Sequence, residues 1–296
     1  MLKLSHISVE IEKVKILEDI CFSAGQGEII GLVAPNGSGK TTLLKTISSL
    51  IPVSKGEMSI YNMNYQNNRE NVLKKVFFLQ DNSVLYPNLS GKEHLKLVQN
   101  LWDSKLSYHD IVEKLNMTSY VDKKVSKYSL GMQQRLLFGM CLISSCDLLL
   151  MDEPMNGLDP TNIKLISETI KQLKAQKKTI LFSSHILSNI DDLCDRVIYL
   201  KDGKIIYESE KNNSPFKKYA KIQFDTVTDF QYIQKIFQSE EFTKINSKSL
   251  ELEVETDKIS LLFNQLANQN IKFNVLYLGN KGSQQIYEDL YEGSGK

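Results

Sequence analysis

The sequence predicts an α/β fold built on a parallel sheet, followed by a small C-terminal α+β domain. Short apolar runs, typical of strands buried on both faces, alternate with segments of helical periodicity. A glycine-rich loop joins one of these runs to the helix that follows it. A polar segment from residue 211, containing Pro215, marks a linker. We therefore expect one domain over residues 1–210 and a second over 211–296.

The elements of the first domain follow in order. Alternating or clustered β-branched and apolar residues predict the first two strands, and a continuous apolar run predicts the third. The residues after the glycine-rich loop have helical spacing, and a capping box of Ser90 and Glu93 opens a mainly helical region that extends to about residue 145. Strands alternating with helices then imply a parallel sheet with ligands at its carboxyl edge. The predicted strands cover residues 2–12, 15–24, 28–34, 147–151, 179–183 and 197–200.

The second domain has enough apolar residues for a core of its own. Its pattern predicts an α+β order that ends in a short helix. Such an order also occurs in RNA-recognition modules, but the balanced charge of this part and the missing aromatic-glycine strand motif oppose that interpretation. The predicted elements are a strand at 220–225, a helix at 228–238, two strands within 242–254, a helix at 257–269 and a strand at 271–278.

Composition excludes several classes of function. The 296 residues include 36 Lys plus Arg and 35 Asp plus Glu, and neither predicted domain has a basic excess, which disfavours nucleic acid as a partner. No apolar run is long enough to cross a bilayer, and no signal peptide is evident, so a membrane function would need a separate membrane protein. The four cysteines lie among apolar neighbours and are expected to be buried free thiols of a reducing compartment.

The glycine-rich loop is a phosphate-binding P-loop, Ala34-Pro-Asn-Gly-Ser-Gly-Lys-Thr41, with alanine at its usual first glycine. Its glycines let successive backbone N–H groups point at phosphate oxygens, and the helix that follows aims its positive end at them. Lys40 is expected to reach the β- and γ-phosphates, and the Thr41 hydroxyl to ligate Mg²⁺. The remaining residues expected to hold the nucleotide here are Asn36, Gly37, Ser38, Gly39 and Thr42.

Polar residues lie at the ends of three further apolar runs. Asp152 is placed to hold the metal, and Glu153 projects one residue further, where it could polarise an attacking water. His185 ends another strand and could hydrogen-bond the γ-phosphate and orient that water. Gln80 follows the run VFFL, and its amide oxygen could touch Mg²⁺ or water. These residues predict a magnesium–nucleotide site with hydrolytic chemistry.

The order of the motifs resembles the ATP-binding cassette (ABC) nucleotide-binding domain. The P-loop, Gln80, the segment Tyr128-Ser-Leu-Gly-Met-Gln-Gln-Arg135, the acidic strand end, the segment Asn156-Gly-Leu-Asp159 and His185 occur in the order of that family over about residues 1–210. The resemblance implies a RecA-like core, a β-subdomain and a helical subdomain at about 85–145. The variant YSLGM is similar to ATPases of bacitracin-resistance and lantibiotic-immunity exporters.

The resemblance also implies roles for single residues. Ser129 and Gly131 match the signature motif, which contacts the γ-phosphate of the opposite monomer, and Asp159 matches the aspartate that couples the two sites. One cassette per chain makes half of each site, so a homodimer or a pair with a related ATPase is expected. Ile11 aligns where the family places an aromatic residue under adenine, so selectivity for the base is expected to be weak.

Taken together, the resemblance implies the ATP-hydrolysing motor of an exporter. It predicts ATP and Mg²⁺ as cofactors, a separate membrane permease as partner, and a location at the cytoplasmic face of a bacterial membrane. The exported substrate would be an antimicrobial or toxic amphipathic peptide, and residues 211–296 resemble the accessory domain of ABC-2 type exporters. A soluble ABC-type ATPase acting outside transport is the alternative. A GTPase is disfavoured, since Asn280-Lys-Gly-Ser283 lacks the required acid.

Overall fold

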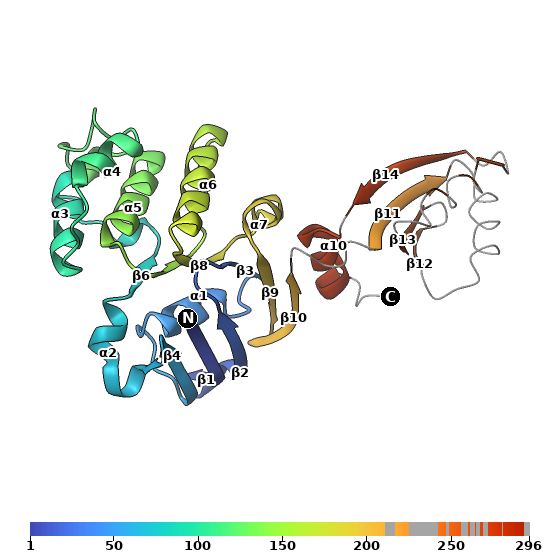
Figure 1. Ribbon diagram of the computed structural model, residues 1–296, viewed down its shortest axis with the longest axis horizontal. Coiled ribbons are helices and arrows are strands. Elements are labelled where there is room, and N and C mark those ends of the chain that lie inside the picture. The colour runs from blue at the N-terminus through green and yellow to red at the C-terminus, as the bar shows by residue number, and fades with distance from the viewer. Residues whose placement is uncertain are drawn as a thin grey trace. The chain divides into compact units, whose positions relative to one another are not determined.

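A computed structural model describes residues 1–210, 217–224, 242–246, 249–255, 260, 264, 267–268, 272–279 and 281–292. The chain divides into two compact units, Met1–Lys211 and Asn212–Lys296 (Figure 1). Each unit is described by itself.

The first unit opens with an antiparallel sheet in the order β2-β1-β4-β5. Apolar side chains along β1 and β2 point to one face, as the alternation in the sequence predicts. The first two predicted strands are confirmed as β1 and β2, whereas β4 and β5 were not predicted. The strands are β1 (Leu2–Ile11), β2 (Val14–Ala24), β4 (Lys55–Ile60) and β5 (Met63–Asn64).

A six-stranded sheet in the order β10-β9-β3-β8-β7-β6 forms the centre of this unit. Its strands are parallel except for β10, which pairs antiparallel with β9 at one edge. Strands β3, β7 and β8 are buried along their whole length, which explains their continuous apolar runs. The strands are β3 (Ile29–Val33), β6 (Val76–Leu79), β7 (Leu148–Met151), β8 (Thr179–Ser183), β9 (Arg196–Lys201) and β10 (Lys204–Glu210).

Helices connect these strands, and α3, α4 and α5 pack together as a separate helical group (Figure 1). The capping box of Ser90 and Glu93 begins α3 as predicted, with the Ser90 amide donating to the Glu93 carboxylate at 2.7 Å. Of the helices in the described part of the chain, none has the length and hydropathy that crossing a membrane requires. The helices are α1 (Lys40–Ile47), α2 (Tyr65–Leu73), α3 (Gly91–Leu101), α4 (Tyr108–Lys114), α5 (Leu130–Ser144), α6 (Pro160–Ala175) and α7 (Leu187–Leu193).

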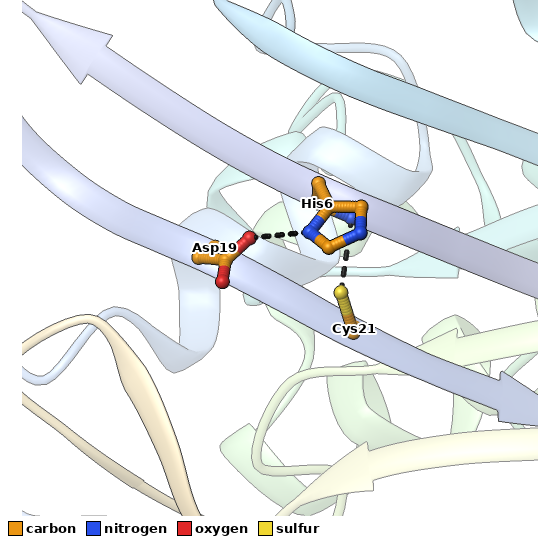
Figure 2. A group of neighbouring side chains, drawn as sticks. All are labelled: His6, Asp19 and Cys21. Carbon is orange, nitrogen blue, oxygen red and sulfur yellow. Dashed lines mark hydrogen bonds and ion pairs between the residues drawn. The ribbon is translucent and has the colours of Figure 1, made fainter.

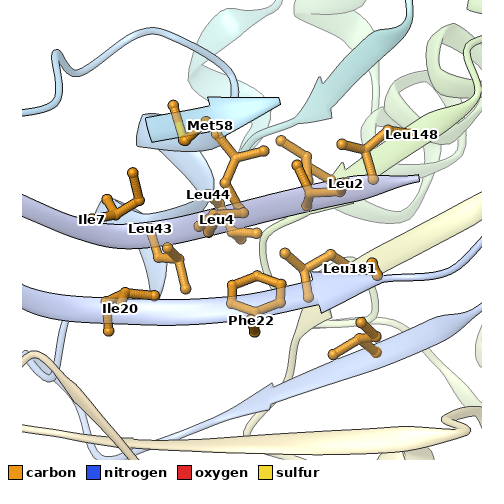
Figure 3. Close-up of a cluster of buried hydrophobic side chains, with 14 of the residues drawn as sticks. Leu2, Leu4, Ile7, Ile20, Phe22, Leu43, Leu44, Met58, Leu148 and Leu181 are labelled. Carbon is orange, nitrogen blue, oxygen red and sulfur yellow. The ribbon is translucent and has the colours of Figure 1, made fainter. Parts of the chain in front are cut away.

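The main core of this unit joins the two sheets through α1. Leu43 and Leu44 of α1 are fully buried in one cluster with side chains of β1 and β2 and with Leu148 and Leu181 of the six-stranded sheet (Figure 3). Burial of this apolar surface, worth about 25 cal/mol per Å², fixes the start of α1 against both sheets. The loop that precedes α1 is therefore held from two sides.

The cysteines correct one expectation. Cys141, Cys146 and Cys194 are buried, and burial raises the pKa of the Cys146 thiol to about 12. Cys21, however, is exposed. It lies between Ile20 and Phe22 in β2, and these two side chains occupy the inner face, so strand alternation turns Cys21 outward.

The second unit contains an antiparallel sheet in the order β12-β13-β11-β14. The strands fall where the sequence predicts them, and the chain then forms the short helix α10 (Ser283–Tyr287) and a π-helical turn, Glu288–Glu292. The helix predicted at 228–238 lies outside the described residues, as does most of the one at 257–269. The strands are β11 (Lys217–Phe224), β12 (Phe242–Asn246), β13 (Ser249–Glu255) and β14 (Phe273–Gly279).

Candidate active site

The P-loop connects the end of β3 to the start of α1. Gly37 and Gly39 have φ angles of +81° and +99°, a region that residues with side chains rarely adopt. A Cβ atom on Gly39 would also lie 2.8 Å from the Leu17 side chain of β2. Gly39 is the N-cap of α1 and gives the helix no side-chain cap, so the first-turn amides suit an anion.

Lys40 folds back across this loop. Its ammonium group donates hydrogen bonds to the Ala34 carbonyl at 2.6 Å and the Pro35 carbonyl at 3.2 Å. Burial lowers the pKa of Lys40, and the negative charges of Glu153 and Asp152 act in the opposite direction. The lysine is therefore a half-buried cation directed into the concave side of the loop, facing two carboxylates across it.

Asp152 links the P-loop to two neighbouring strands. One carboxylate oxygen accepts a hydrogen bond of 2.6 Å from the Thr41 hydroxyl, and the other accepts one of 2.6 Å from the Ser183 hydroxyl. The contact with Ser183 follows from strand register. Met151 of β7 pairs with Phe182 of β8, and the residues that follow these two are Asp152 and Ser183. These contacts form a hard-oxygen centre at the carboxyl edge of the sheet.

Glu153 and His185 extend this arrangement. The Glu153 amide donates to the Ser183 hydroxyl at 2.9 Å, and the His185 imidazole Nδ1 lies 2.7 Å from Glu153 Oε2. Glu153 has a φ angle of +50°, a conformation that a side chain makes unfavourable by about 1–3 kcal/mol. The hydroxyl of Ser183 thus supports both acidic residues. Sequence reasoning missed Ser183, although its position at the end of β8 could have indicated it.

Gln80 follows a strand, and Ile11 lies in the first hairpin. Gln80 directly follows β6, whose last residue pairs with Met151 of β7, so Gln80 is half-buried one strand away from Asp152. Ile11 ends β1 at the tip of the β1–β2 hairpin and is 40% exposed. The neighbouring strand β2 supplies the Leu17 side chain that contacts Gly39.

The signature segment lies at the start of α5, away from these contacts. Ser129 is the N-cap of α5, and its hydroxyl accepts a hydrogen bond from the Met132 amide at 3.3 Å. Ser129 and Leu130 are exposed, whereas Tyr128 before them is buried. The structure thus brings together Lys40, Thr41, Asp152, Glu153 and His185, but it places Ser129 and Gly131 on a different helix.

The start of α5 contacts the start of α6 instead. Arg135 of α5 donates to the Asn162 side-chain oxygen at 2.6 Å, and Asn162 in turn hydrogen-bonds the carboxylate of Asp159, the N-cap of α6. The Leu130 side chain lies against Gly157, where a Cβ atom would come within 2.8 Å of it. The segment that contains Ser129 and the segment that contains Asp159 are therefore in contact within the same chain.

The chain is similar in sequence to known proteins. The sequence model of the ABC transporter family matches residues 17–156. An uncharacterized ABC transporter ATP-binding protein of Bacillus subtilis, YdbJ, is 38% identical over 210 residues, which are 69% of this chain and 68% of that protein. The lantibiotic transport ATP-binding protein SrtF of Streptococcus pyogenes is 34% identical over 215 residues, covering 72% of this chain and 93% of that protein.

A solved structure supports the same fold. A dimeric ATP-binding cassette in a post-hydrolysis state with ADP and Pi superposes with a TM-score of 0.65 at 24% identity, over 72% of this chain and all of that one. The α/β fold class is therefore confirmed. Membership of the family that the relatives above show means that the chain binds and hydrolyses ATP. The protein belongs to the family of ABC transporter ATP-binding proteins.

Proposed function

We propose that this chain is the motor of an exporter, in which ATP binding closes a dimer of two cassettes and hydrolysis reopens it. The observation that carries the proposal is the hydrogen-bonded series from Thr41 through Asp152 and Ser183 to Glu153 and His185. It connects Thr41 and Asp152, which would supply oxygen ligands for a metal–nucleotide complex, to Glu153. The Glu153 amide is hydrogen-bonded to Ser183, and its carboxylate contacts His185. Binding and hydrolysis of ATP would be linked through these contacts.

The P-loop would hold the phosphates. The backbone amides from Asn36 to Thr42 and the positive end of α1 would surround the β-phosphate, as helix N-termini do for anions. The Lys40 ammonium would exchange its two carbonyl contacts for the β- and γ-phosphate oxygens. The contacts with the two carbonyls already direct the Lys40 ammonium group across the loop before the phosphates arrive.

The residues present fit Mg²⁺. Thr41 Oγ1 lies 2.6 Å from Asp152 Oδ2, and Gln80 follows the adjacent strand, so the donors are oxygens, which this hard cation prefers. Thr41, Gln80 and Asp152 would hold the ion directly or through water. When bound, Mg²⁺ neutralises phosphate charge.

Glu153 would act as the general base and His185 as its positioning partner. Glu153 Oε2 receives the His185 Nδ1 contact of 2.7 Å, which fixes the direction of the carboxylate. The imidazole is half-exposed and would be free to reach the γ-phosphate with its second nitrogen. A water between the γ-phosphorus and the carboxylate would then lose its proton to Glu153 as it attacks, and the bond from the γ-phosphorus to the oxygen of the β-phosphate would break to release ADP.

The second half of the site would come from a partner cassette. Ser129, the exposed N-cap of α5, and the half-buried Gly131 lie at the start of this helix, where a helix N-terminus suits the γ-phosphate of another chain. Asp159 would couple the two sites across the dimer. Either a homodimer or a pair with a related ATPase satisfies this arrangement.

A separate membrane permease would dock on the segment after Gln80. Val84 and Tyr86 are exposed apolar side chains in this segment, beside the helical group. A coupling helix of the permease could cover them, and movement of α3–α5 on ATP binding would then reach the membrane. This docking would hold the chain at the cytoplasmic face of a bacterial membrane.

We further propose an antimicrobial or toxic amphipathic peptide as the substrate class. The support is the likeness to the lantibiotic transport protein of Streptococcus pyogenes over 93% of that protein. Residues 211–296 would serve as an accessory domain, and residues 85–145 as the helical subdomain. Ile11, an aliphatic residue beside adenine, would make the choice of base weak.

The substitution Glu153→Gln tests the proposed mechanism. It keeps the size of the side chain but removes the base, so ATP turnover should fall to background while ATP-dependent dimers accumulate. Turnover is measured as phosphate release, and dimerisation by size-exclusion chromatography with ATP. Glu168→Gln, on the exposed face of α6, is the matched control and should behave as the unmodified protein. Unchanged turnover in Glu153→Gln would rule out the proposed base.

A further inference from the structure

Three potential metal ligands meet on the outer face of the β1–β2 hairpin, apart from the candidate active site. One nitrogen of His6, a carboxylate oxygen of Asp19 and the thiol sulfur of Cys21 lie within 4.8 Å of one another. Figure 2 shows the imidazole of β1 between the carboxylate and the thiol of β2. His6 Nδ1 is 2.7 Å from Asp19 Oδ1.

The backbone brings these side chains together through two irregularities in the strand pairing. The register of β1 and β2 shifts between Leu4 and Ile7 and again between Ile7 and Val9. His6 and Asp19 have φ angles of +54° and +55°, which are uncommon for residues with side chains. As in a β-bulge, such a shift re-aims a side chain, and here it turns His6 and Asp19 toward the same outer face as Cys21.

Side chains compensate for the ladder bonds that these irregularities remove. The His6 amide donates to the Cys21 sulfur at 3.1 Å, and the Asp19 amide donates to the Ser8 hydroxyl at 3.1 Å. This hydrogen bond restrains the direction of the Cys21 side chain. The Cys21 sulfur is therefore held in place before any ion arrives.

The neighbouring strand β4 accommodates the same distortion. A Cβ atom on Gly56, which has a φ angle of +95°, would lie 2.3 Å from the His6 carbonyl oxygen. Only glycine therefore fits beside His6 without moving the backbone. Strained conformations persist when their surroundings fix them, and they are often retained at functional sites. Here both flanking strands fix the position of His6.

We propose that His6, Asp19 and Cys21 bind a Zn²⁺ ion on the outer face of the hairpin. Imidazole nitrogen, carboxylate oxygen and thiolate sulfur are the three ligand types that zinc combines, and mutual distances below 4.8 Å need only small side-chain rotations to reach tetrahedral geometry. The His6 and Asp19 side chains are 78% and 66% exposed, so water can supply the fourth ligand. The ion would connect β1 to β2, and β2 is the strand whose Leu17 side chain contacts Gly39 of the P-loop.

Metal binding is measured on the full chain after removal of metal by a chelator. Zn²⁺ is titrated against a chromophoric chelator in excess Mg²⁺, which would compete for the hard-oxygen centre of Thr41 and Asp152. Co²⁺ serves as a spectroscopic probe, because a Co²⁺–thiolate bond gives a charge-transfer band. The unmodified chain should bind one ion with this band and should unfold at a higher temperature with Zn²⁺ than without it.

Three substitutions test the ligands while preserving the backbone. Cys21→Ser keeps an acceptor for the His6 amide but should abolish the charge-transfer band. His6→Asn and Asp19→Asn retain residues that tolerate positive φ. Each of the three should weaken Zn²⁺ binding by about tenfold or more. His109→Asn, at an exposed histidine of α4, is the control and should bind as the unmodified chain does.

The proposal is overturned if the unmodified chain does not compete with the chelator. It is equally overturned if Cys21→Ser retains the thiolate band, or if all three variants bind Zn²⁺ with the affinity of the His109→Asn control. Circular dichroism of each variant shows whether the hairpin is still folded. A folded variant with lost binding supports the assignment.

Discussion

The carboxyl edge of the six-stranded sheet and the start of α5, which we propose as the two halves of one type of site, differ in how their polar groups are satisfied. At the sheet edge, Thr41, Asp152, Ser183, Glu153 and His185 hydrogen-bond one another. At the start of α5, the hydroxyl of Ser129 caps only its own helix. The first half is assembled within the chain, whereas the second is presented at the surface.

The glycines of the two regions differ in the same way. Gly39 is required by the chain itself, since its φ is +99° and a Cβ atom would lie 2.8 Å from Leu17. Gly131 is not, because it is helical and a Cβ atom there would meet Asn162 at 3.7 Å, an ordinary contact. A requirement for glycine at position 131 would therefore come from something outside the chain, such as a nucleotide held by a partner.

The largest expected effect comes from Gly131→Asp. A carboxylate at the second position of α5 suits the helix dipole, so folding should be unchanged, but it would repel a γ-phosphate. We expect ATP turnover to fall by about 100-fold or more, with ATP binding to the P-loop of the same chain unaltered. Phosphate release and equilibrium nucleotide binding measure the two effects.

His109→Asp is the control, because it places the same charge at the second position of the neighbouring helix α4. Its turnover should equal that of the unmodified chain. Loss of nucleotide binding in Gly131→Asp would show that α5 contributes to the site of its own chain, and the distinction between the two halves would fail.

Ser183→Ala disturbs the half assembled within the chain. The substitution removes the donor to Asp152 and leaves the Glu153 amide without its acceptor. Loss of such a supporting contact typically costs about 10- to 100-fold, and we expect this range in kcat with little change in KM. Ser144→Ala, at a buried serine of α5, is the control. Equal kcat values for the two variants would mean that Ser183 does not position the acids.

Asn162→Ala separates the two helices at the second half. The side chain is 5% exposed and joins Arg135 to Asp159, so its removal leaves a guanidinium without that partner. We expect a free energy of unfolding lower by about 1–3 kcal/mol, measured by urea denaturation. Turnover should fall several-fold because Ser129 and Asp159 lose their fixed separation. The exposed Asn100→Ala is the control, and equal stability of both variants would contradict the role given to Asn162.

Ile11→Tyr is expected to change nucleotide affinity and leave folding and the catalytic step unchanged. A ring beside adenine contributes about 1–3 kcal/mol of stacking, so the Kd for ATP should decrease by roughly tenfold. Ile206→Tyr on β10 is the control, since Ile206 has the same 40% exposure. An unchanged Kd for Ile11→Tyr would mean that the base lies elsewhere.

Sequence patterns predicted the elements that contain long apolar runs or clear caps. Strands β3, β7 and β8 were found because burial on both faces leaves a continuous apolar signal. The helical spacing after the P-loop includes Leu50, but α1 ends at Ile47 and Leu50 is exposed. The short strand β5 and helix α2 were missed because neither has a marked apolar period.

The residues of the candidate site were predictable from motifs, but their contacts were not. The spacing around Lys40, Asp152 and Glu153 indicates phosphate and metal chemistry, because few residue types can perform it. Ser183 carries no motif, and its role depends on the register of β7 with β8. The cluster of His6, Asp19 and Cys21 depends in the same way on two register shifts between strands.

The sequence by itself determined the α/β class, the P-loop and the family, because backbone periodicity and phosphate chemistry leave local signals. Only the tertiary structure decided that Ser183 supports both acids, that Asn162 joins α5 to α6 and that Cys21 faces solvent beside His6. These contacts join residues far apart in the chain or on different strands. Their distances depend on strand register and helix packing, which are collective properties of the folded chain.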